Sequence, residues 1–144
     1  MDQLLDNRIL GASILAWVLA QLSKGLIVLL HQGRFHLRVL TSAGGMPSSH
    51  SALVAALATA IGLREGVRSP LFAVAIVFAA VVLYDAAGVR RAVSHQARIM
   101  NRLLEEVIEY QRFSEQRLFE LIGHTPFEVF VGTMLGVATA LSFV

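Results

Sequence analysis

Apolar residues along this chain form four long runs separated by short polar segments. The runs cover residues 9–30, 48–63, 71–87 and 126–144. The first run would be about 33 Å long as a helix, enough to cross the hydrocarbon core of a bilayer. The second is shorter and rich in alanine, which favours close packing against neighbouring helices. The pattern predicts an all-α, polytopic membrane bundle with about four membrane-embedded helices.

A fifth segment, residues 92–120, has a different pattern. Apolar residues recur at helical spacing, and charged residues of both signs lie between them. One apolar stripe with a polar face is typical of an amphipathic helix at a membrane interface or protruding from it. We therefore predict one long amphipathic helix here, with a role in structure or self-association.

Composition agrees with a membrane protein. Hydrophobic residues make up 56% of the 144 residues and charged residues 15%, against roughly 45–50% and 25% in soluble domains. The absence of cysteine excludes disulfides, thiolate metal sites and a cysteine nucleophile. A net charge of +2 gives no indication of nucleic-acid binding. We expect a single membrane-embedded domain over residues 1–144, in the cell membrane or, in a eukaryote, an organelle membrane.

The polar stretch 44–51, Gly-Gly-Met-Pro-Ser-Ser-His-Ser, directly precedes the second apolar run. Pro47 fits just before or at the start of a new helix, and Ser48 or Ser49 is a good N-cap. His50 then lies in the first helical turn, where free backbone N–H groups and the helix dipole attract anions such as phosphate. The alternative is a capped helix start with a surface histidine.

A second histidine lies at the start of the fourth run. In residues 123–128, Gly-His-Thr-Pro-Phe-Glu, Thr125 is the predicted N-cap and Glu128 the third helical residue. This is a capping box, which by itself accounts for Glu128. His124 comes just before the cap. Gly132 and Gly136 follow with G-x-x-x-G spacing, a signal of close helix packing.

The expected membrane topology brings the residues near the two histidines to one face of the membrane. If the four runs cross the membrane alternately, the second and fourth helices begin on the face where the first and third end. That face then collects two histidines, a carboxylate, two serines and three cations: Lys24, Ser48, Ser49, His50, Arg90, Arg91, His124 and Glu128. The sequence thus predicts an anion site with two helix dipoles and two proton-transfer groups.

Each of the three cations also has a simpler explanation. Lys24 lies six residues from the end of its run and could snorkel to the interface instead of facing a site. Arg90 and Arg91 could flank the membrane as a basic pair. They could also form an ion pair with Asp85 that closes a helix end, or a phosphate clamp held by that carboxylate.

The predicted set suits phosphoryl transfer through histidine. One neutral imidazole attacks phosphorus while a carboxylate on its other nitrogen fixes the tautomer. The second histidine, protonated, gives its proton to the leaving oxygen. Lysine, arginine and backbone N–H groups hold the phosphoryl oxygens.

The same residues resemble a known superfamily. Pro-Ser-Ser-His at 47–50 resembles the P-S-G-H signature of type 2 phosphatidic acid phosphatases and vanadium-dependent haloperoxidases. His-Thr-Pro-Phe-Glu-Val at 124–129 resembles that superfamily's H-x-x-x-D segment, with Glu in place of Asp. Together with Asp-Ala-Ala-Gly-Val-Arg-Arg at 85–91, these runs are similar to its divergent branch, the acid phosphatase or haloperoxidase-related membrane proteins. The resemblance covers residues 24–136.

The resemblance implies a role for each matching residue. His124 would be the nucleophile, Glu128 its orienting carboxylate and His50 the general acid. Ser48 and the backbone around Ser49 would bind phosphate, and Lys24 matches the lysine of the superfamily motif K-x6-R-P.

Two arginines of the superfamily pattern are missing from this sequence. His31 stands where the arginine of K-x6-R-P belongs, and Leu118 where an arginine precedes the second histidine. We expect Arg90 and Arg91 to supply the lost charge.

The resulting expectation is an integral membrane phosphatase that hydrolyses a lipid phosphate or diphosphate without a metal or cofactor. The main alternative is a non-catalytic membrane protein that keeps an anion or lipid-headgroup site. Vanadate-dependent halide oxidation and a small transporter are further alternatives.

Expected partners are the lipid substrate and membrane lipids, with no nucleic acid. We also expect a possible homodimer through the amphipathic helix or the glycine face. Nine basic residues on the motif-bearing face against three on the other place that face in the cytoplasm.

Overall fold

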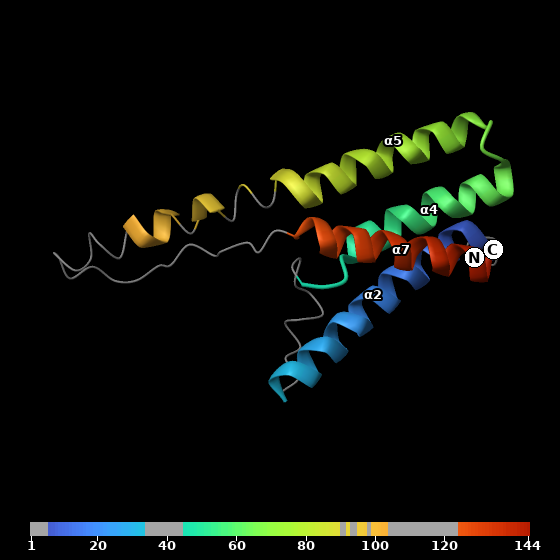
Figure 1. The fold of residues 1–144 in the computed structure, drawn as a ribbon. Helices are drawn as coiled ribbons and strands as arrows, with labels where there is room; N and C mark the ends of the chain where they lie inside the picture. The colour runs from blue at the N-terminus through green and yellow to red at the C-terminus, as the bar shows by residue number, and fades with distance from the viewer. Residues whose placement is uncertain (1–5, 34–44, 90–91, 93–94, 98, 104–123) are drawn as a thin grey trace.

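In the computed structural model, described residues are 6–33, 45–89, 92, 95–97, 99–103 and 124–144. Regular structure in these residues is helical (Figure 1), which confirms the all-α prediction. The elements are α2 (Arg8–Gln32), α4 (Ser49–Glu65), α5 (Pro70–Tyr84) with a π-helical extension η1 (Asp85–Val89), and α7 (Pro126–Phe143). Most of the predicted amphipathic helix, and both Arg90 and Arg91, lie outside the described residues.

Three helical segments of the described chain are long and apolar enough to cross a membrane. They are Arg8–His31, Pro70–Gly88 and Pro126–Phe143. The fourth helix, α4, has 17 residues. At 1.5 Å per residue it is about 25 Å long, at the short end of what spans a bilayer. The chain is therefore an all-α membrane protein, and in its described residues three of the four predicted membrane-embedded runs are long and apolar enough to cross a bilayer.

Local sequence signals set the helix ends. Asn7 caps α2 by accepting a hydrogen bond from the Leu10 N–H at 3.0 Å, and Ser69 caps α5 from the Phe72 N–H at 3.1 Å. Gly33 ends α2 in the left-handed conformation, with φ 64°, and donates its N–H to the Leu29 carbonyl oxygen. These caps satisfy backbone groups that a helix end leaves without partners.

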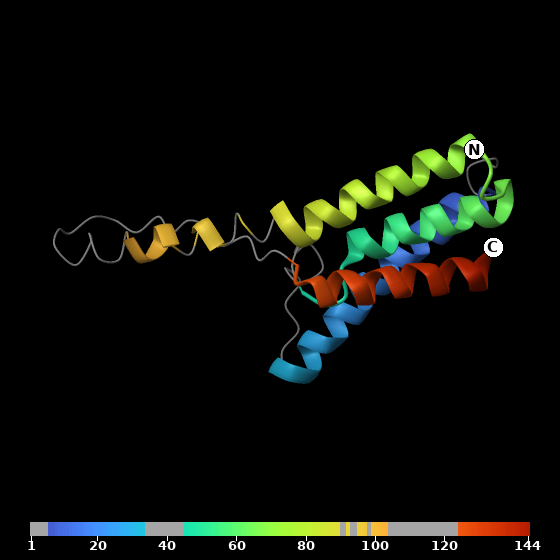
Figure 2. The same cartoon turned by 45° about the horizontal axis from the view of Figure 1, so that its top comes forward.

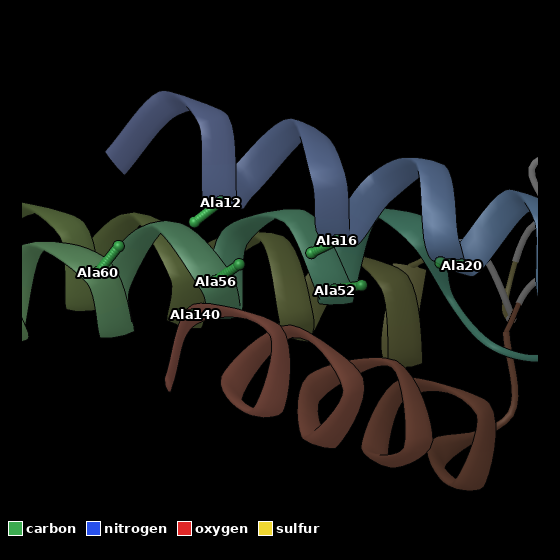
Figure 3. Close-up of a cluster of buried hydrophobic side chains, with 7 residues drawn as sticks. All are labelled: Ala12, Ala16, Ala20, Ala52, Ala56, Ala60 and Ala140. Atoms are coloured by element: carbon green, nitrogen blue, oxygen red, sulfur yellow. The ribbon is translucent and has the colours of Figure 1, made fainter. Parts of the chain in front are cut away.

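The central helix is α4, which packs against α2, α5 and α7. On one side its contacts are made almost entirely of alanine (Figure 3). The cluster contains three alanines from α2, three from α4 and one from α7: Ala12, Ala16, Ala20, Ala52, Ala56, Ala60 and Ala140. Within a bilayer, burial from water does not drive helices together, so small residues that allow close backbone contact stabilise the bundle by packing.

A second cluster joins α4 to α5 through larger side chains. Val54, Ala58 and Ile61 of α4 pack on Ala75 and Ala79 of α5. Most of the other α5 residues face outward, where lipid would cover them. The helix α5 thus contacts the bundle along one narrow stripe.

The helix directions agree with the predicted topology. Figures 1 and 2 show that α4 and α7 begin at the end of the bundle where α5 finishes, and that α2 runs toward that end while diverging from the other helices. At the opposite end the start of α2 meets the end of α7: a Cβ added to Gly11 would lie 3.1 Å from the Phe143 ring. The two histidine-bearing helix starts therefore share one end of the bundle.

Candidate active site

His124 and Glu128 form a pair at the start of α7, in which His124 is buried and Glu128 is partly exposed. His124 is 1% exposed, and its Nδ1 lies 3.2 Å from Glu128 Oε2. The same carboxylate oxygen accepts the Thr125 N–H at 3.0 Å, and the Glu128 N–H donates to Thr125 Oγ1 at 3.2 Å. The capping box is therefore present, and one carboxylate oxygen serves both the helix cap and the histidine.

This contact assigns the histidine tautomer. An ionised carboxylate can only accept hydrogen bonds, so Nδ1 of His124 carries the proton that it donates to Glu128. In the neutral ring the lone pair then lies on Nε2, which is buried. A neutral imidazole oriented in this way is the form that can act as a nucleophile.

The Pro-Ser-Ser-His turn is attached directly to the start of α7. The Ser48 N–H donates to the Glu128 carbonyl oxygen at 3.1 Å. Pro47, Ser48 and Ser49 are all buried, while His50, the second residue of α4, is partly exposed. A backbone hydrogen bond thus joins the two helix starts that carry the histidines.

Ser48 is the N-cap of α4. Its Oγ accepts the Ser51 N–H at 3.4 Å and the Ser51 hydroxyl at 2.8 Å. Ser48 and Ser51 are both 0% exposed. The cap is therefore a buried pair of hydroxyl groups, adjacent in sequence to His50.

Two glycines set the register of the two helix starts. A Cβ on Gly132 would clash with the Ser48 carbonyl oxygen, and one on Gly136 with the Ala52 carbonyl oxygen; both would come closer than the 3.0 Å that real Cβ atoms keep. Both pairs are four residues apart, so α4 and α7 run in parallel with their backbones touching. The glycine face is thus covered by α4 within one chain.

Lys24 lies inside the bundle at the same end. Its side chain is 2% exposed, and a Cβ added to Gly45 would lie 3.5 Å from its Cγ and Cδ atoms. Gly45 has φ 90°, a conformation suited to glycine, and brings the loop backbone against the lysine stem. The ammonium group interacts electrostatically with Glu128. The lysine therefore faces the polar cluster, whereas snorkelling would take it to the membrane interface.

The structure thus brings six of the eight predicted residues to one end of the bundle: Lys24, Ser48, Ser49, His50, His124 and Glu128. Arg90 and Arg91 are outside the described residues. The helix leading to them ends in the π-helical turn η1, which contacts α7. Among the described residues there is no group of three His, Cys, Asp or Glu side chains that could hold a metal.

Three contributors to the site were not expected from the sequence. The Ser51 hydroxyl donates a hydrogen bond to Ser48, the Gly45 backbone packs against the Lys24 side chain, and Gly132 lets the α7 backbone contact the Ser48 carbonyl oxygen. The serine three residues after the N-cap was a usable signal, because that position faces the cap across one helical turn. The glycine contacts depend on how distant helices pack, which local patterns do not specify.

Comparison with known proteins identifies the family. A family model described as the divergent PAP2 family matches residues 5–139. The chain belongs to this family. It is also 39% identical over 153 residues to YuiD, an uncharacterized membrane protein of Bacillus subtilis (strain 168), with 96% of this chain and 95% of YuiD covered. No solved structure matches the chain.

Membership of the divergent PAP2 family confirms the resemblance drawn from residues 24–136. The matched region includes both histidine-bearing helix starts and all four described helices up to residue 139. The protein is a PAP2-like membrane protein.

Proposed function

We propose that this protein is an integral membrane phosphatase that hydrolyses a lipid phosphate or diphosphate through a phosphohistidine on His124. The contact between His124 Nδ1 and Glu128 Oε2 carries the proposal, because it leaves the Nε2 lone pair to attack phosphorus. The position of the site at one end of a membrane bundle suits a phosphate headgroup at the bilayer surface.

In the first step, His124 Nε2 forms a bond to phosphorus and the bond from phosphorus to the leaving oxygen breaks. Glu128 stabilises the positive charge that develops on the imidazole. His50, protonated, donates its proton to the leaving oxygen, so the lipid leaves as an alcohol, or as a monophosphate if the substrate is a diphosphate.

In the second step, His50 is neutral and accepts a proton from water. The resulting hydroxide attacks phosphorus, and the bond from phosphorus to His124 Nε2 breaks. Inorganic phosphate leaves, His124 is neutral again, and His50 is again protonated. Lys24, Ser48 and the backbone at Ser49 stabilise the phosphoryl oxygens in both steps.

A second candidate function is a membrane protein that binds an anion or lipid headgroup without turnover. His31, which replaces a superfamily arginine, is exposed and donates Nδ1 to the Ile27 carbonyl oxygen of its own helix at 3.1 Å. It therefore does not replace the arginine's charge at the site. The Ser48 N–H, bonded to Glu128, is likewise committed within the protein.

Phosphate release by the purified protein in detergent separates the two candidates. We would test phosphatidate, phosphatidylglycerol phosphate and an isoprenyl diphosphate with the parent, His124→Ala and His50→Ala. We expect release by the parent, loss of it in His124→Ala, and a decrease of roughly 10²–10⁴-fold in His50→Ala. No release on any substrate, with vanadate still raising the melting temperature of the parent and not of the variants, would favour the binding protein. Release unchanged in His124→Ala would refute the proposed nucleophile.

Two further variants separate the roles of Glu128. Glu128→Gln keeps a side chain that can complete the capping box but removes the charge beside His124. Thr125→Ala removes the cap and keeps the charge, at a cost of about 1 kcal/mol in stability. We expect Glu128→Gln to reduce turnover far more than Thr125→Ala, and Thr125→Ala to reduce the free energy of unfolding more. Equal turnover in the two variants would contradict the orienting role.

We also propose that residues 1–144 form one domain, with the histidine-bearing end toward the cytoplasm. Dimerisation would use the amphipathic segment, because α4 already covers the glycine face within one chain. Light scattering of the detergent-solubilised protein would test the oligomeric state.

A further inference from the structure

The Ser48 and Ser51 hydroxyls form a directed pair at the start of α4. A serine oxygen has two lone pairs and one hydrogen to donate. At Ser48 Oγ the lone pairs accept from the Ser51 N–H at 3.4 Å and the Ser51 hydroxyl at 2.8 Å. The hydrogen of Ser48 is therefore the one bonding position that these two contacts leave.

A buried hydroxyl hydrogen normally has an acceptor. Ser48 is 0% exposed, and in the described part of the chain no hydrogen bond from its hydroxyl is found. The Ser48 backbone N–H bonds to the Glu128 carbonyl oxygen, and Ser48 lies two residues before His50 in the sequence. An anion bound between the two helix starts would supply the acceptor, since a phosphoryl oxygen accepts strongly from O–H groups.

We infer that Ser51 is a positioning residue: its hydroxyl donates to Ser48 Oγ and so turns the Ser48 hydrogen toward the phosphoryl oxygen of the substrate. This inference rests on the proposed anion site but not on turnover. Without the Ser51 hydroxyl, one lone pair of Ser48 Oγ would lose its partner. The Ser48 hydroxyl could then rotate and donate to a backbone carbonyl oxygen instead of to the anion.

The pair also distinguishes Ser51, the third residue of α4, from a serine further along a helix. A serine there usually bonds to the carbonyl four residues earlier, as Ser13 does with Ile9 at 2.9 Å. The Ser51 hydroxyl instead donates to the side chain of the N-cap residue, Ser48, three residues earlier. Its partner is a predicted phosphate ligand, so the bond orders a group in the site as well as the helix.

The test is vanadate binding to the full-length protein in detergent, measured by calorimetry, for Ser51→Ala, Ser48→Ala and the double variant. Hydrogen bonds to charged groups contribute enough for about a tenfold change in affinity when one is lost. We expect each single variant to bind vanadate about tenfold more weakly, and the double variant to bind no more weakly than Ser48→Ala. Ser13→Ala, which also removes a buried serine hydroxyl, should bind like the parent. Ser51→Thr, which restores a hydroxyl, should regain most of the affinity.

Several outcomes would overturn the inference. The first is that Ser51→Ala binds vanadate as tightly as the parent. The second is that the losses of affinity in the two single variants multiply in the double variant. The third is that Ser13→Ala loses as much affinity as Ser51→Ala, which would indicate a general packing effect. Far-ultraviolet circular dichroism and gel filtration check that each variant is folded, and Ser51→Thr gives the answer if Ser51→Ala does not fold. The proposed hydrolysis can be refuted independently of this inference. If the parent binds vanadate but releases no phosphate, turnover is refuted, and the vanadate-binding test of Ser51 still applies.

Discussion

The central helix α4 meets α7 and α5 through two different kinds of surface. Toward α7 there is almost no side chain: Gly132 and Gly136 let the α7 backbone touch the Ser48 and Ala52 carbonyls. Toward α5 the contact is made by larger groups, such as Ile61 packed near Ala75 and Ala79. A backbone contact fixes position closely, whereas side chains can adjust their rotamers. The rigid contact is the one that holds the two histidines in register.

The two partners of α4 also differ in hydropathy. The window Pro70–Gly88, which contains α5, has a mean hydropathy of 2.2, and 17% of it is buried within the protein. For Pro126–Phe143, which is α7, the values are 1.4 and 28%. The more apolar helix is thus the less buried one, because lipid covers its outer surface. Between α5 and α7, the higher hydropathy thus belongs to the helix with more surface toward lipid.

The largest loss of stability should come from adding a side chain in the contact between α4 and α7. In Gly132→Ala the new Cβ meets a backbone carbonyl that cannot move without shifting the helix. We expect the free energy of unfolding in detergent to fall by about 3 kcal/mol or more. Gly88→Ala is the matched control, because its Cβ would meet nothing within 4 Å. Equal stability of the two variants would show that the backbones are not held together.

A smaller effect should follow from emptying the contact between α4 and α5. Ile61 is 5% exposed, and Ile61→Ala leaves a cavity beside Ala75 and Ala79. We expect a loss of about 2 kcal/mol in the free energy of unfolding. Vanadate affinity should stay close to the parent's, since this side of α4 faces away from the contact between α4 and α7. A large decrease in affinity would mean that α5 also positions the site.

Adding a side chain in the contact between α4 and α5 should reduce the free energy of unfolding less than adding one between α4 and α7. A Cβ on Gly62 would lie 2.9 Å from Cε2 of the Phe72 ring. A ring can rotate away where a backbone carbonyl cannot, and alanine favours a helix over glycine by up to about 1 kcal/mol. We expect Gly62→Ala to change the free energy of unfolding by less than about 1 kcal/mol. A loss as large as that in Gly132→Ala would remove the distinction between the two surfaces.

The smallest effect is expected on the lipid-facing side of α5. Ile76 is 45% exposed, so Ile76→Ala creates no cavity within the protein. We expect a change within about 0.5 kcal/mol in the same unfolding measurement. A loss that matched Ile61→Ala would reveal a protein partner on this surface.

Much of the fold follows from local sequence signals. The predicted run 9–30 is α2, the run 48–63 is α4, and the runs beginning at 71 and 126 are α5 and α7. Thr125 caps α7 as expected, and Ser48, one of the two candidates, caps α4. These signals are readable because a cap, a proline or a change in apolar pattern acts within a few residues. Alternate crossing then suffices to bring the helix starts to one end.

The remaining features depend on contacts between distant segments. The π-helical turn after Tyr84 has no clear local signal, and the glycines at 132 and 136 could equally have faced a second chain. That Glu128 caps α7 and contacts His124 with one oxygen follows from the orientation of its side chain, which spacing does not determine. The positions of Arg90 and Arg91 and the amphipathic helix over residues 92–120 stay predictions.

The contact between Gly11 and Phe143 places the start of α2 and the end of α7 together, at the end of the bundle opposite to the histidines. A fluorescent or protease-cleavable reporter fused to either terminus would therefore lie across the membrane from His50 and His124. Its accessibility in intact cells would reveal the compartment into which the site opens. Such a fusion would also leave the histidine-bearing end unobstructed, so the same tagged protein could serve for both the localisation and the phosphate assay.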